Sequence, residues 1–262
     1  MPYEHIKLEI DDRHIATLTL DREDKHNAMG TQMMREIQRA CGEINDNDEI
    51  RAVVLTGAGE KSFSAGADLG WMKANFEKNR EERIAESGQL AETLEALNTV
   101  DKVTIARING QAYAGAVGLI CVCDIAIAVD SARFSLTETR LGLTPANISP
   151  YVIARLGVSN SRRILLNAHF FSGQEAVQLG LVHKVVSADS LDDAVESEIK
   201  SCLACAPGAI AMTKELIRRV SQQSMEENRS YTAQLLADAW EGDEAQAGIG
   251  GFFKKQSPPW AG

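Results

Sequence analysis

The sequence has few cysteines and comparatively few basic side chains. Its 262 residues include five cysteines, and 27 Lys and Arg stand against 37 Asp and Glu, which gives a formal net charge of −10 at pH 7. An odd number of cysteines in a chain of this length does not indicate a disulfide framework. The acidic balance argues against a nucleic-acid-binding surface, which normally carries clustered Lys and Arg. We therefore expect no nucleic acid among the partners.

A long apolar run is also missing from the sequence. The longest uncharged run, residues 108–123, is shorter than the roughly 20 apolar residues that a membrane-spanning helix needs. The N-terminal segment carries Glu4, Lys7 and Glu9, where a secretory signal would need an apolar core. The sequence therefore predicts a cytoplasmic protein that has no membrane partner.

Two of the cysteines, Cys202 and Cys205, have the spacing of a metal knuckle or a redox pair. A structural zinc site needs a second such pair or histidines at suitable spacing. The only other pair, Cys121 and Cys123, lies far upstream in an apolar run. We therefore expect no metal site, and we interpret the cysteines as small hydrophobic residues that pack in the interior.

The composition that remains is that of a globular protein with a large core. Hydrophobic residues make up 44% of the chain and charged residues 24%, both close to the averages for soluble proteins. The length predicts one large domain, or one domain with an appendage.

Apolar patterning predicts strands that alternate with helical stretches. Two strands and a turn are expected within residues 3–20, and further strands at 52–55, 103–108, 125–129 and 181–186. Helical spacing connects Met33, Met34, Ile37, Cys41 and Ile44, and a second apolar stripe connects Ile84, Ala91, Leu94 and Leu97. This alternation predicts an α/β fold with mostly parallel crossovers.

The last third of the sequence is mainly helical. Capping boxes at residues 172–175 and 224–227 each predict the start of a helix, and further helices are expected at 191–206 and 208–220. We expect a catalytic core at residues 1–200 and a helical region at 201–262 that docks on the core or on another subunit.

Two glycine-bearing loops, residues 57–68 and 109–118, each follow an apolar strand. The first lacks the third glycine of a dinucleotide-binding fingerprint, because Ser62 stands at that place. Small residues let a backbone approach a ligand closely, and two such loops side by side would offer two N–H groups to one oxygen, as an oxyanion hole does. Spacing alone leaves small-residue packing as an equal alternative.

Five segments in order resemble the crotonase (enoyl-CoA hydratase/isomerase) superfamily. Residues 63–69 (FSAGADL) and 109–124 are similar to its two oxyanion-loop motifs, and residues 20–29 (LDREDKHNAM) to its coenzyme A segment. Residues 176–182 and 252–255 match downstream landmarks of the family. The resemblance spans essentially the whole chain.

The resemblance implies a spiral of repeated ββα units with a C-terminal helical region that forms homotrimers or dimers of trimers. It implies that the backbone N–H groups of Ala67 and Gly115 hold the thioester oxygen. It further implies an acyl-CoA site lined by Lys25, Ala28, Ala65, Asp68, Leu69, Gly70 and Gly118. No cofactor is expected, because coenzyme A is part of the substrate.

The candidate acid–base group is Glu138. From the bare sequence, Glu138 beside Arg140 reads as a surface ion pair, but the position matches the family's second catalytic glutamate. A carboxyl group near an apolar acyl pocket, with its pKa raised by burial, suits proton transfer at the α-carbon. The family's usual hydratases carry a first glutamate where this chain has Gly118, and a single glutamate is also seen in its double-bond isomerases.

A second departure from the family pattern points to one branch. Residues 142–151, together with Gly118 and residues 69–72, resemble hydratases of methylglutaconyl-CoA and isohexenylglutaconyl-CoA, which serve leucine and acyclic-terpene breakdown. Such substrates carry a distal carboxylate, for which Arg140, Asn147 and Tyr113 are possible donors. Because the chain is acidic, binding of the anionic coenzyme A is expected to depend on backbone N–H groups and on local cations such as Lys25, Arg22 or Lys254.

The sequence therefore predicts an enoyl-CoA hydratase that acts on a branched, carboxylated acyl-CoA such as 3-methylglutaconyl-CoA. Two alternatives stay open. The first is an enoyl-CoA double-bond isomerase that uses one glutamate, and the second is a non-catalytic acyl-CoA-binding member of the family.

Overall fold

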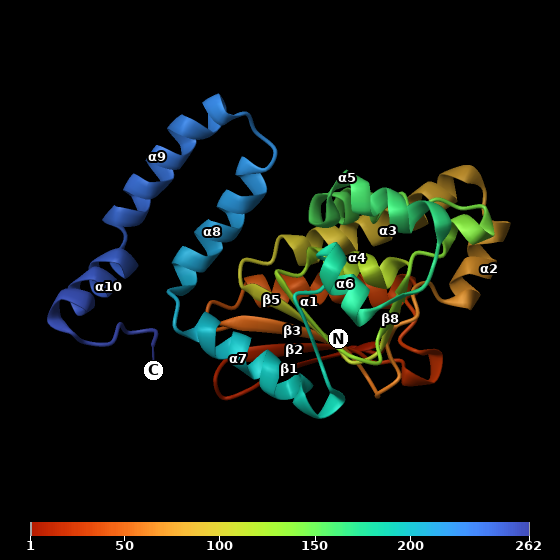
Figure 1. Cartoon of the computed structure of the whole chain (residues 1–262), viewed down its shortest axis with the longest axis horizontal. Helices are drawn as coiled ribbons and strands as arrows, with labels where there is room; N and C mark the ends of the chain where they lie inside the picture. The colour runs from red at the N-terminus through yellow and green to blue at the C-terminus, as the bar shows by residue number, and fades with distance from the viewer. Residues whose placement is uncertain (1, 262) are drawn as a thin grey trace.

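The computed structural model describes residues 2–261 and contains two β-sheets with helices on both sides (Figure 1). Residues 1 and 262, at the outer ends of the two expected regions, lie outside this range. The larger sheet has the strand order β1-β2-β3-β5-β7-β10, in which β1 is antiparallel to β2 and the other pairs are parallel. Its strands are β1 (Ile6–Ile10), β2 (Ile15–Leu20), β3 (Ala52–Gly57), β5 (Val103–Ile108), β7 (Ile125–Val129) and β10 (Lys184–Val186).

The smaller sheet supplies the second strand of each repeated ββα unit. Its strands, in the order β4-β6-β8-β9, are β4 (Ser62–Ser64), β6 (Gln111–Tyr113), β8 (Arg133–Ser135) and β9 (Phe171–Ser172). Each of β3, β5 and β7 in the larger sheet is followed directly by β4, β6 or β8 in the smaller one, and then by helix. These three ββα turns confirm the expected spiral.

The core lies between the larger sheet and the helices that cover it. The helices around the core are α1 (Thr31–Asn45), α3 (Arg80–Asn98), α4 (Gly115–Val122), α5 (Ser149–Asn167), α6 (Gly173–Leu179) and α7 (Leu191–Leu203). Every residue of β3 is buried, which is typical of a parallel strand that is covered on both faces. The α1 stripe predicted from Met33 to Ile44 is buried as expected, and α4 is buried on all sides because its residues are small or apolar.

The C-terminal helices extend away from the sheets (Figure 1). They are α8 (Pro207–Val220), α9 (Met225–Glu241) and α10 (Asp243–Lys254). Lys214 is the only buried residue of α8, and α9 and α10 have none in the described chain. The Lys214 ammonium anchors α8 to the core, donating to the Lys102 carbonyl at 2.7 Å and to Asp124 Oδ2 at 2.5 Å.

Some local expectations from the sequence were wrong. The stripe from Ile84 to Leu97 lies within one helix, α3, which Asn79 caps through a capping box with Glu82 after α2 (Leu69–Glu77) has ended. Its first residue is not packed as expected, because Ile84 is 56% exposed. The helix expected to reach residue 206 ends at Leu203, and Pro207 takes the first position of α8, which suits its fixed φ. The last strand is shorter than expected, because Leu181 N–H instead caps α6 at the Ala176 carbonyl.

Candidate active site

The segments that carry the predicted catalytic groups follow three neighbouring strands of the smaller sheet. β4 leads to Ala67, β6 leads to Gly115, and β8 leads to Glu138. Both strand pairs, β4 with β6 and β6 with β8, are parallel, so their carboxyl ends meet at one edge, where parallel sheets bind ligands. The loops are in close contact there, since a β-carbon built on Gly66 would lie 2.7 Å from the Tyr113 carbonyl oxygen.

The peptide that carries the Ala67 N–H group is fixed by a bridge to the segment before α1. Met29 N–H donates to the Gly66 carbonyl at 2.7 Å, and Asp68 N–H donates to the Met29 carbonyl at 2.8 Å. These two bonds flank Ala67 on either side. Within residues 2–261, no acceptor takes the Ala67 N–H itself, so this donor is available to a ligand.

Gly115 offers the second backbone donor. As the first residue of α4, it has no intrahelical acceptor for its N–H, which lies at the positive end of the helix dipole. A β-carbon here would lie 2.9 Å from Met29 Cε, the flexible end of that side chain. Met29 therefore touches both loops, through its backbone at Gly66 and through its side chain at Gly115.

The residue before Gly115 is strained. Ala114 has φ 50° and ψ −120°, a combination that a residue with a β-carbon rarely adopts. A hydrogen bond of 2.9 Å from Ala114 N–H to the Ser135 carbonyl, at the end of β8, holds the turn in place. Backbone strain of this kind clusters at functional sites, and here it turns the chain from β6 directly into the start of α4.

Glu138 opens the 3-10 helix η2 (Glu138–Leu141), three positions beyond Ser135. Its Oε2 atom is buried and has no hydrogen-bond partner within residues 2–261. Burial raises the pKa of Glu138 above its usual range, and the hydrogen bond from its own backbone N–H opposes the shift only in part. The ion pair with Arg140 that the bare sequence suggested does not form, because the Arg140 guanidinium lies over the Phe170 ring, 5.2 Å from its centroid.

Gly118 lies one turn further along α4 and is closed off by Ile148. A β-carbon built on Gly118 would lie 2.6 Å from Ile148 Cγ2 and 3.3 Å from Leu94 Cδ2. These contacts leave no room for a glutamate at this position unless Ile148 moves. The described site therefore contains one of the two carboxylates that a two-glutamate hydratase would use.

Asp68 ties the expected coenzyme A segment to the start of α2. Its Oδ1 accepts the Trp71 N–H as the helix cap, and its Oδ2 accepts from Arg22 Nη2 at 2.9 Å, while Lys25 Nζ lies 3.9 Å away. Burial raises the pKa of Asp68, but the Trp71 N–H and the Arg22 guanidinium outweigh burial and hold the pKa below its usual range. Asp68 therefore has a structural role, as the cap of α2 and the partner of Arg22.

The same network changes the interpretation of Arg22. Its guanidinium also donates to the Ala28 carbonyl at 2.8 Å, and its side chain is only 11% exposed, so Arg22 is not free to bind coenzyme A as the sequence suggested. Lys25 keeps 54% of its side chain exposed and remains available.

Of the other predicted lining residues, Ala65 lies in the first glycine-bearing loop, whereas Leu69 and Gly70 are exposed at the start of α2. Ala65 N–H donates to the His26 carbonyl at 2.9 Å, which joins the first loop to the coenzyme A segment. Leu69 and Gly70 begin α2, and Leu69 is 81% exposed. Lys254 lies on α10, at the opposite end of the molecule from α2, so one chain does not bring it to this site (Figure 1).

Two of the three donors proposed for a distal carboxylate are occupied. The Asn147 amide donates to the Ser87 carbonyl and hydroxyl, and the Tyr113 hydroxyl donates to Gln111 Oε1 at 2.9 Å. Arg140 forms no ion pair within the described residues, and its side chain is exposed.

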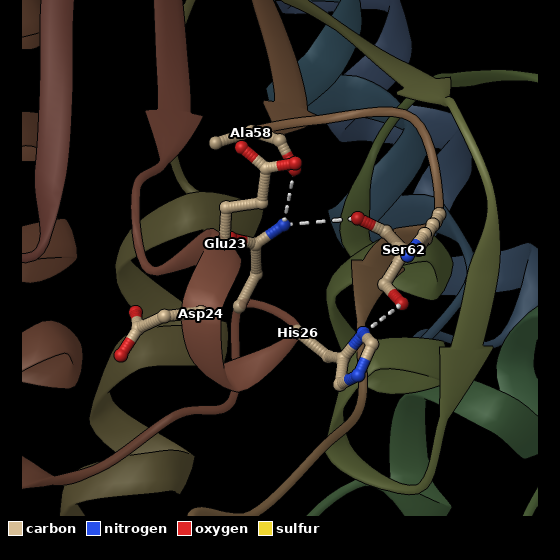
Figure 2. A pocket seen from close by; sticks show the side chains of 7 residues that line it. Glu23, Asp24, His26, Ala58 and Ser62 are labelled. Carbon is tan, nitrogen blue, oxygen red and sulfur yellow. Dashed lines mark hydrogen bonds between the residues drawn. The ribbon is translucent and has the colours of Figure 1, made fainter.

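A polar cavity of about 410 Å³ lies beside the coenzyme A segment. Figure 2 shows the His26 ring and the Ser62 hydroxyl facing each other, 3.2 Å apart, below Glu23 and Ala58. The cavity is lined by Glu23, Asp24, His26, Asn27, Ala58, Lys61 and Ser62. Glu23, Asp24, His26 and Asn27 belong to the expected coenzyme A segment, although none of the seven lining residues was predicted individually to line the acyl-CoA site.

No three His, Cys, Asp or Glu side chains within residues 2–261 are grouped to hold a metal ion. All five cysteines are free thiols. Four are buried, which confirms their interpretation as packing residues, but that interpretation was wrong for Cys205, which is exposed just beyond the end of α7. In the part of the chain that is described, no helix has the length and apolar character to span a membrane.

Three residues that shape this site were missed from the sequence. Met29, Ala114 and Ile148 each lay inside a segment that resembles the family, but none of them was assigned a role of its own. No sequence signal shows a positive φ at an alanine or the side chain that will fill the space beside a glycine. Only Met29, as the apolar residue that ends the coenzyme A segment, offered a hint.

Comparison with known proteins agrees with this geometry. A family model described as enoyl-CoA hydratase/isomerase matches residues 11–262. A short-chain-enoyl-CoA hydratase of Clostridium acetobutylicum is 30% identical, with 92% of each chain covered, and a carnitinyl-CoA dehydratase of Escherichia coli O157:H7 is 32% identical, with 95% of each covered. The crystal structure of an enoyl-CoA hydratase from Shewanella pealeana superimposes with a TM-score of 0.94 at 34% identity, covering 98% of this chain and 96% of that one.

Proposed function

The chain belongs to the enoyl-CoA hydratase/isomerase family and is an enzyme, and we propose that it adds water across the 2,3-double bond of an acyl-CoA thioester. One observation carries the proposal. The segments that bear the unpaired backbone N–H groups of Ala67 and Gly115, and the segment that bears the buried carboxyl of Glu138, all follow the same edge of the smaller sheet. The finer substrate that we propose is a branched, carboxylated thioester such as 3-methylglutaconyl-CoA.

The reaction balances with one carboxylate. Glu138 accepts a proton from water while the water oxygen bonds to C3, and the electron pair of the double bond moves toward the thioester oxygen. The Ala67 and Gly115 N–H groups stabilise the enolate oxygen that results. Glu138 then returns its proton to C2, so that the addition is syn and the carboxylate is regenerated. No redox change occurs, and the proposal needs no cofactor besides the coenzyme A of the substrate.

The environment of Glu138 suits both halves of this cycle. A carboxyl whose pKa is raised by burial is a better proton acceptor than an ordinary glutamate and is still able to return the proton. The unpartnered Oε2 leaves an oxygen free to face water or substrate.

Arg140 is the group that we propose for a distal carboxylate. It follows Glu138 by two positions, its charge is not neutralised by any described carboxylate, and the Phe170 ring orients its guanidinium. Asn147 and Tyr113 fit this role less well, because their side-chain donors already have partners.

The decisive experiment is a substrate screen with the purified protein. Straight-chain, methyl-branched and carboxylated 2-enoyl-CoA thioesters are compared through the loss of absorbance of the conjugated thioester. We expect the highest kcat/KM with a branched, carboxylated substrate. We also expect Arg140→Met to reduce that preference while leaving the straight-chain rate nearly unchanged. Equal turnover of all chains would refute the finer substrate, and no turnover of any would refute the hydratase.

A second candidate reaction is isomerisation of the double bond. It is favoured by one observation, the closure of position 118 by Ile148, because moving one proton between two carbons needs only one carboxylate. Incubation of a 3-enoyl-CoA in heavy-oxygen water distinguishes the two reactions. A hydratase leaves the unconjugated 3-enoyl-CoA unchanged and adds solvent oxygen only to the 2-enoyl isomer, whereas an isomerase converts the 3-enoyl-CoA into the 2-enoyl-CoA without incorporating oxygen.

We further propose that the tail assembles the chain into a homotrimer or a dimer of trimers. Helices α9 and α10 have no buried residues in the described chain, yet they carry Trp240, Phe252 and Phe253 with 57%, 78% and 79% of their surface exposed. Large apolar patches on a tail without a core of its own are typical of surfaces that a partner covers.

A further inference from the structure

Glu86 on α3 joins three helices through one carboxylate. Its Oε2 accepts from the Thr31 hydroxyl at 2.7 Å and from the Trp71 indole N–H at 3.0 Å. Its Oε1 pairs with Lys78 Nζ at 2.8 Å. Thr31 begins α1, Trp71 lies in the first turn of α2, and Lys78 is the cap at the end of α2.

Helix α2 depends largely on polar contacts for its position. None of its residues is buried, two of its large apolar side chains, Leu69 and Phe76, are more than 80% exposed, and Trp71 packs against the core while only partly buried. Polar contacts at its two ends supplement that limited packing, among them the bonds from the Arg83 guanidinium to the Asn75 and Phe76 carbonyls. Asp68 fixes its start through the Trp71 N–H and through Arg22, and Glu86 holds both its first turn and its end.

The segments joined by Glu86 are the two that frame Ala67. Thr31 lies two positions after Met29, and Trp71 lies four positions after Ala67, while Met29 and Ala67 form the isolated bridge between these segments. The Arg22–Asp68 pair holds this bridge on one side, and Glu86 holds it on the other.

We propose that Glu86 is a positioning residue for the oxyanion-binding N–H of Ala67, acting through Trp71 and Thr31. The proposal rests on the proposed hydratase function, because it presumes that Ala67 binds the thioester oxygen. An oxyanion donor must be held within fractions of an ångström, and a shift of about 1 Å costs roughly 100-fold in rate.

The charge of Glu86 is compatible with an anionic intermediate nearby. Hydrogen bonds from Lys78, Thr31 and Trp71 lower the pKa of Glu86 to about 2, so the carboxylate stays ionised and keeps all three partners at working pH. The Lys78 ammonium neutralises it, which limits repulsion of the enolate.

The test compares Glu86→Gln with wild type in two measurements. The first is kcat and KM for a short 2-enoyl-CoA such as crotonyl-CoA. The second is the near-ultraviolet absorbance of the enolate that forms when acetoacetyl-CoA binds, which reports on the oxyanion donors directly. We expect kcat to fall about 10- to 100-fold, KM to change by less than about threefold, and the enolate absorbance to decrease.

Glu36→Gln is the matched control. Glu36 is a buried carboxylate on α1 that accepts the N–H groups of Glu4 and His5, away from the Ala67 loop. The same substitution there is expected to lower the thermal unfolding temperature without changing the enolate absorbance. If Glu86→Gln does not fold, Thr31→Val and Trp71→Phe each remove one donor to the same carboxylate and are expected to shift kcat in the same direction.

The outcomes separate the positioning role from the proposed function. An active wild type with unchanged kcat and enolate absorbance in Glu86→Gln would overturn the positioning role alone, leaving Glu86 as a purely structural residue. A wild type that neither turns over an enoyl-CoA nor produces the enolate absorbance would overturn the hydratase proposal itself, and the positioning role with it.

Discussion

Ile148 fills the space that a side chain at position 118 would need. Its Cγ2 atom would lie 2.6 Å from a β-carbon on Gly118, far inside van der Waals contact. Ile148 comes from the segment before α5, and Gly118 from the middle of α4, so the two meet only in the folded chain. Because of this pair, position 118 has no room for a carboxylate side chain unless Ile148 moves.

The Gly118–Ile148 pair predicts strong coupling between substitutions at the two positions. Gly118→Ala alone is expected to destabilise the fold by about 1–3 kcal/mol through overpacking. Ile148→Ala alone is expected to cost about 2–5 kcal/mol through the cavity that it leaves. The double variant should be more stable than the sum of the two costs predicts. Denaturant unfolding of all four proteins measures this, and simple additivity would show that the two side chains do not compete for one space.

Substitution of Glu138 is expected to remove most of the turnover. Glu138→Gln keeps the size of the side chain and removes the proton acceptor, so kcat should fall about 10²- to 10⁴-fold while binding of the coenzyme A thioester changes little. Arg133→Gln, an exposed charge on the adjoining strand β8, serves as a control with a near wild-type rate. Unchanged turnover in Glu138→Gln would remove Glu138 from the mechanism.

The raised pKa of Glu138 predicts a pH dependence of both rate and stability. The base must be ionised to accept a proton from water, so kcat/KM should fall on the acidic side at a pH above the usual range of a glutamate. A carboxyl with a raised folded-state pKa holds more protons in the native state than in the unfolded one. The free energy of unfolding therefore decreases as the pH rises from the unfolded to the folded pKa.

Glu138→Gln tests the stability half of that argument. The variant lacks this ionisation, so it should be more stable than wild type at neutral pH and equally stable at a pH below both pKa values. Thermal unfolding across the acidic range provides the comparison. A variant less stable than wild type at neutral pH would contradict the assignment of a desolvated carboxyl.

Lys214 is predicted to hold the tail on the core. Lys214→Met leaves Asp124 and the Lys102 carbonyl without the ammonium. Because Asp124 keeps the Thr104 N–H and hydroxyl as donors and is partly exposed, the cost is expected to stay below the roughly 3–5 kcal/mol of a fully buried pair. Limited proteolysis should then cut first near residues 204–206, between α7 and α8. An unchanged cleavage pattern would show that α8 is held by other contacts.

Substitution of Phe252 and Phe253 together by serine should weaken assembly without loss of the fold, because both side chains are almost fully exposed in one chain. Sedimentation velocity is expected to show trimers or hexamers for wild type and smaller species for the variant. A monomeric wild type would refute the proposed assembly.

The periodicity of apolar residues predicted the major elements of the fold. The strands of the larger sheet and the buried stripe of α1 have enough residues to show a period, and the capping boxes at Ser172 and Ser224 both formed as expected. The smaller sheet was not predicted from periodicity, because strands of two or three residues, such as β4 and β6, have no period to read. They lie inside what the sequence shows only as glycine-bearing loops.

The sequence by itself determined the family, the order of its motifs and the identity of the candidate groups Ala67, Gly115 and Glu138. Only the tertiary structure decided the surroundings of these groups. The acidic chain showed a shortage of cations, and the fold then committed Arg22 to Asp68 and left Lys25 exposed. Pairing of β4, β6 and β8 joined the three loops, and burial changed the pKa of Glu138. The physical reason is that a sequence motif fixes residue types, whereas distances, burial and hydrogen-bond partners arise between segments far apart in the chain.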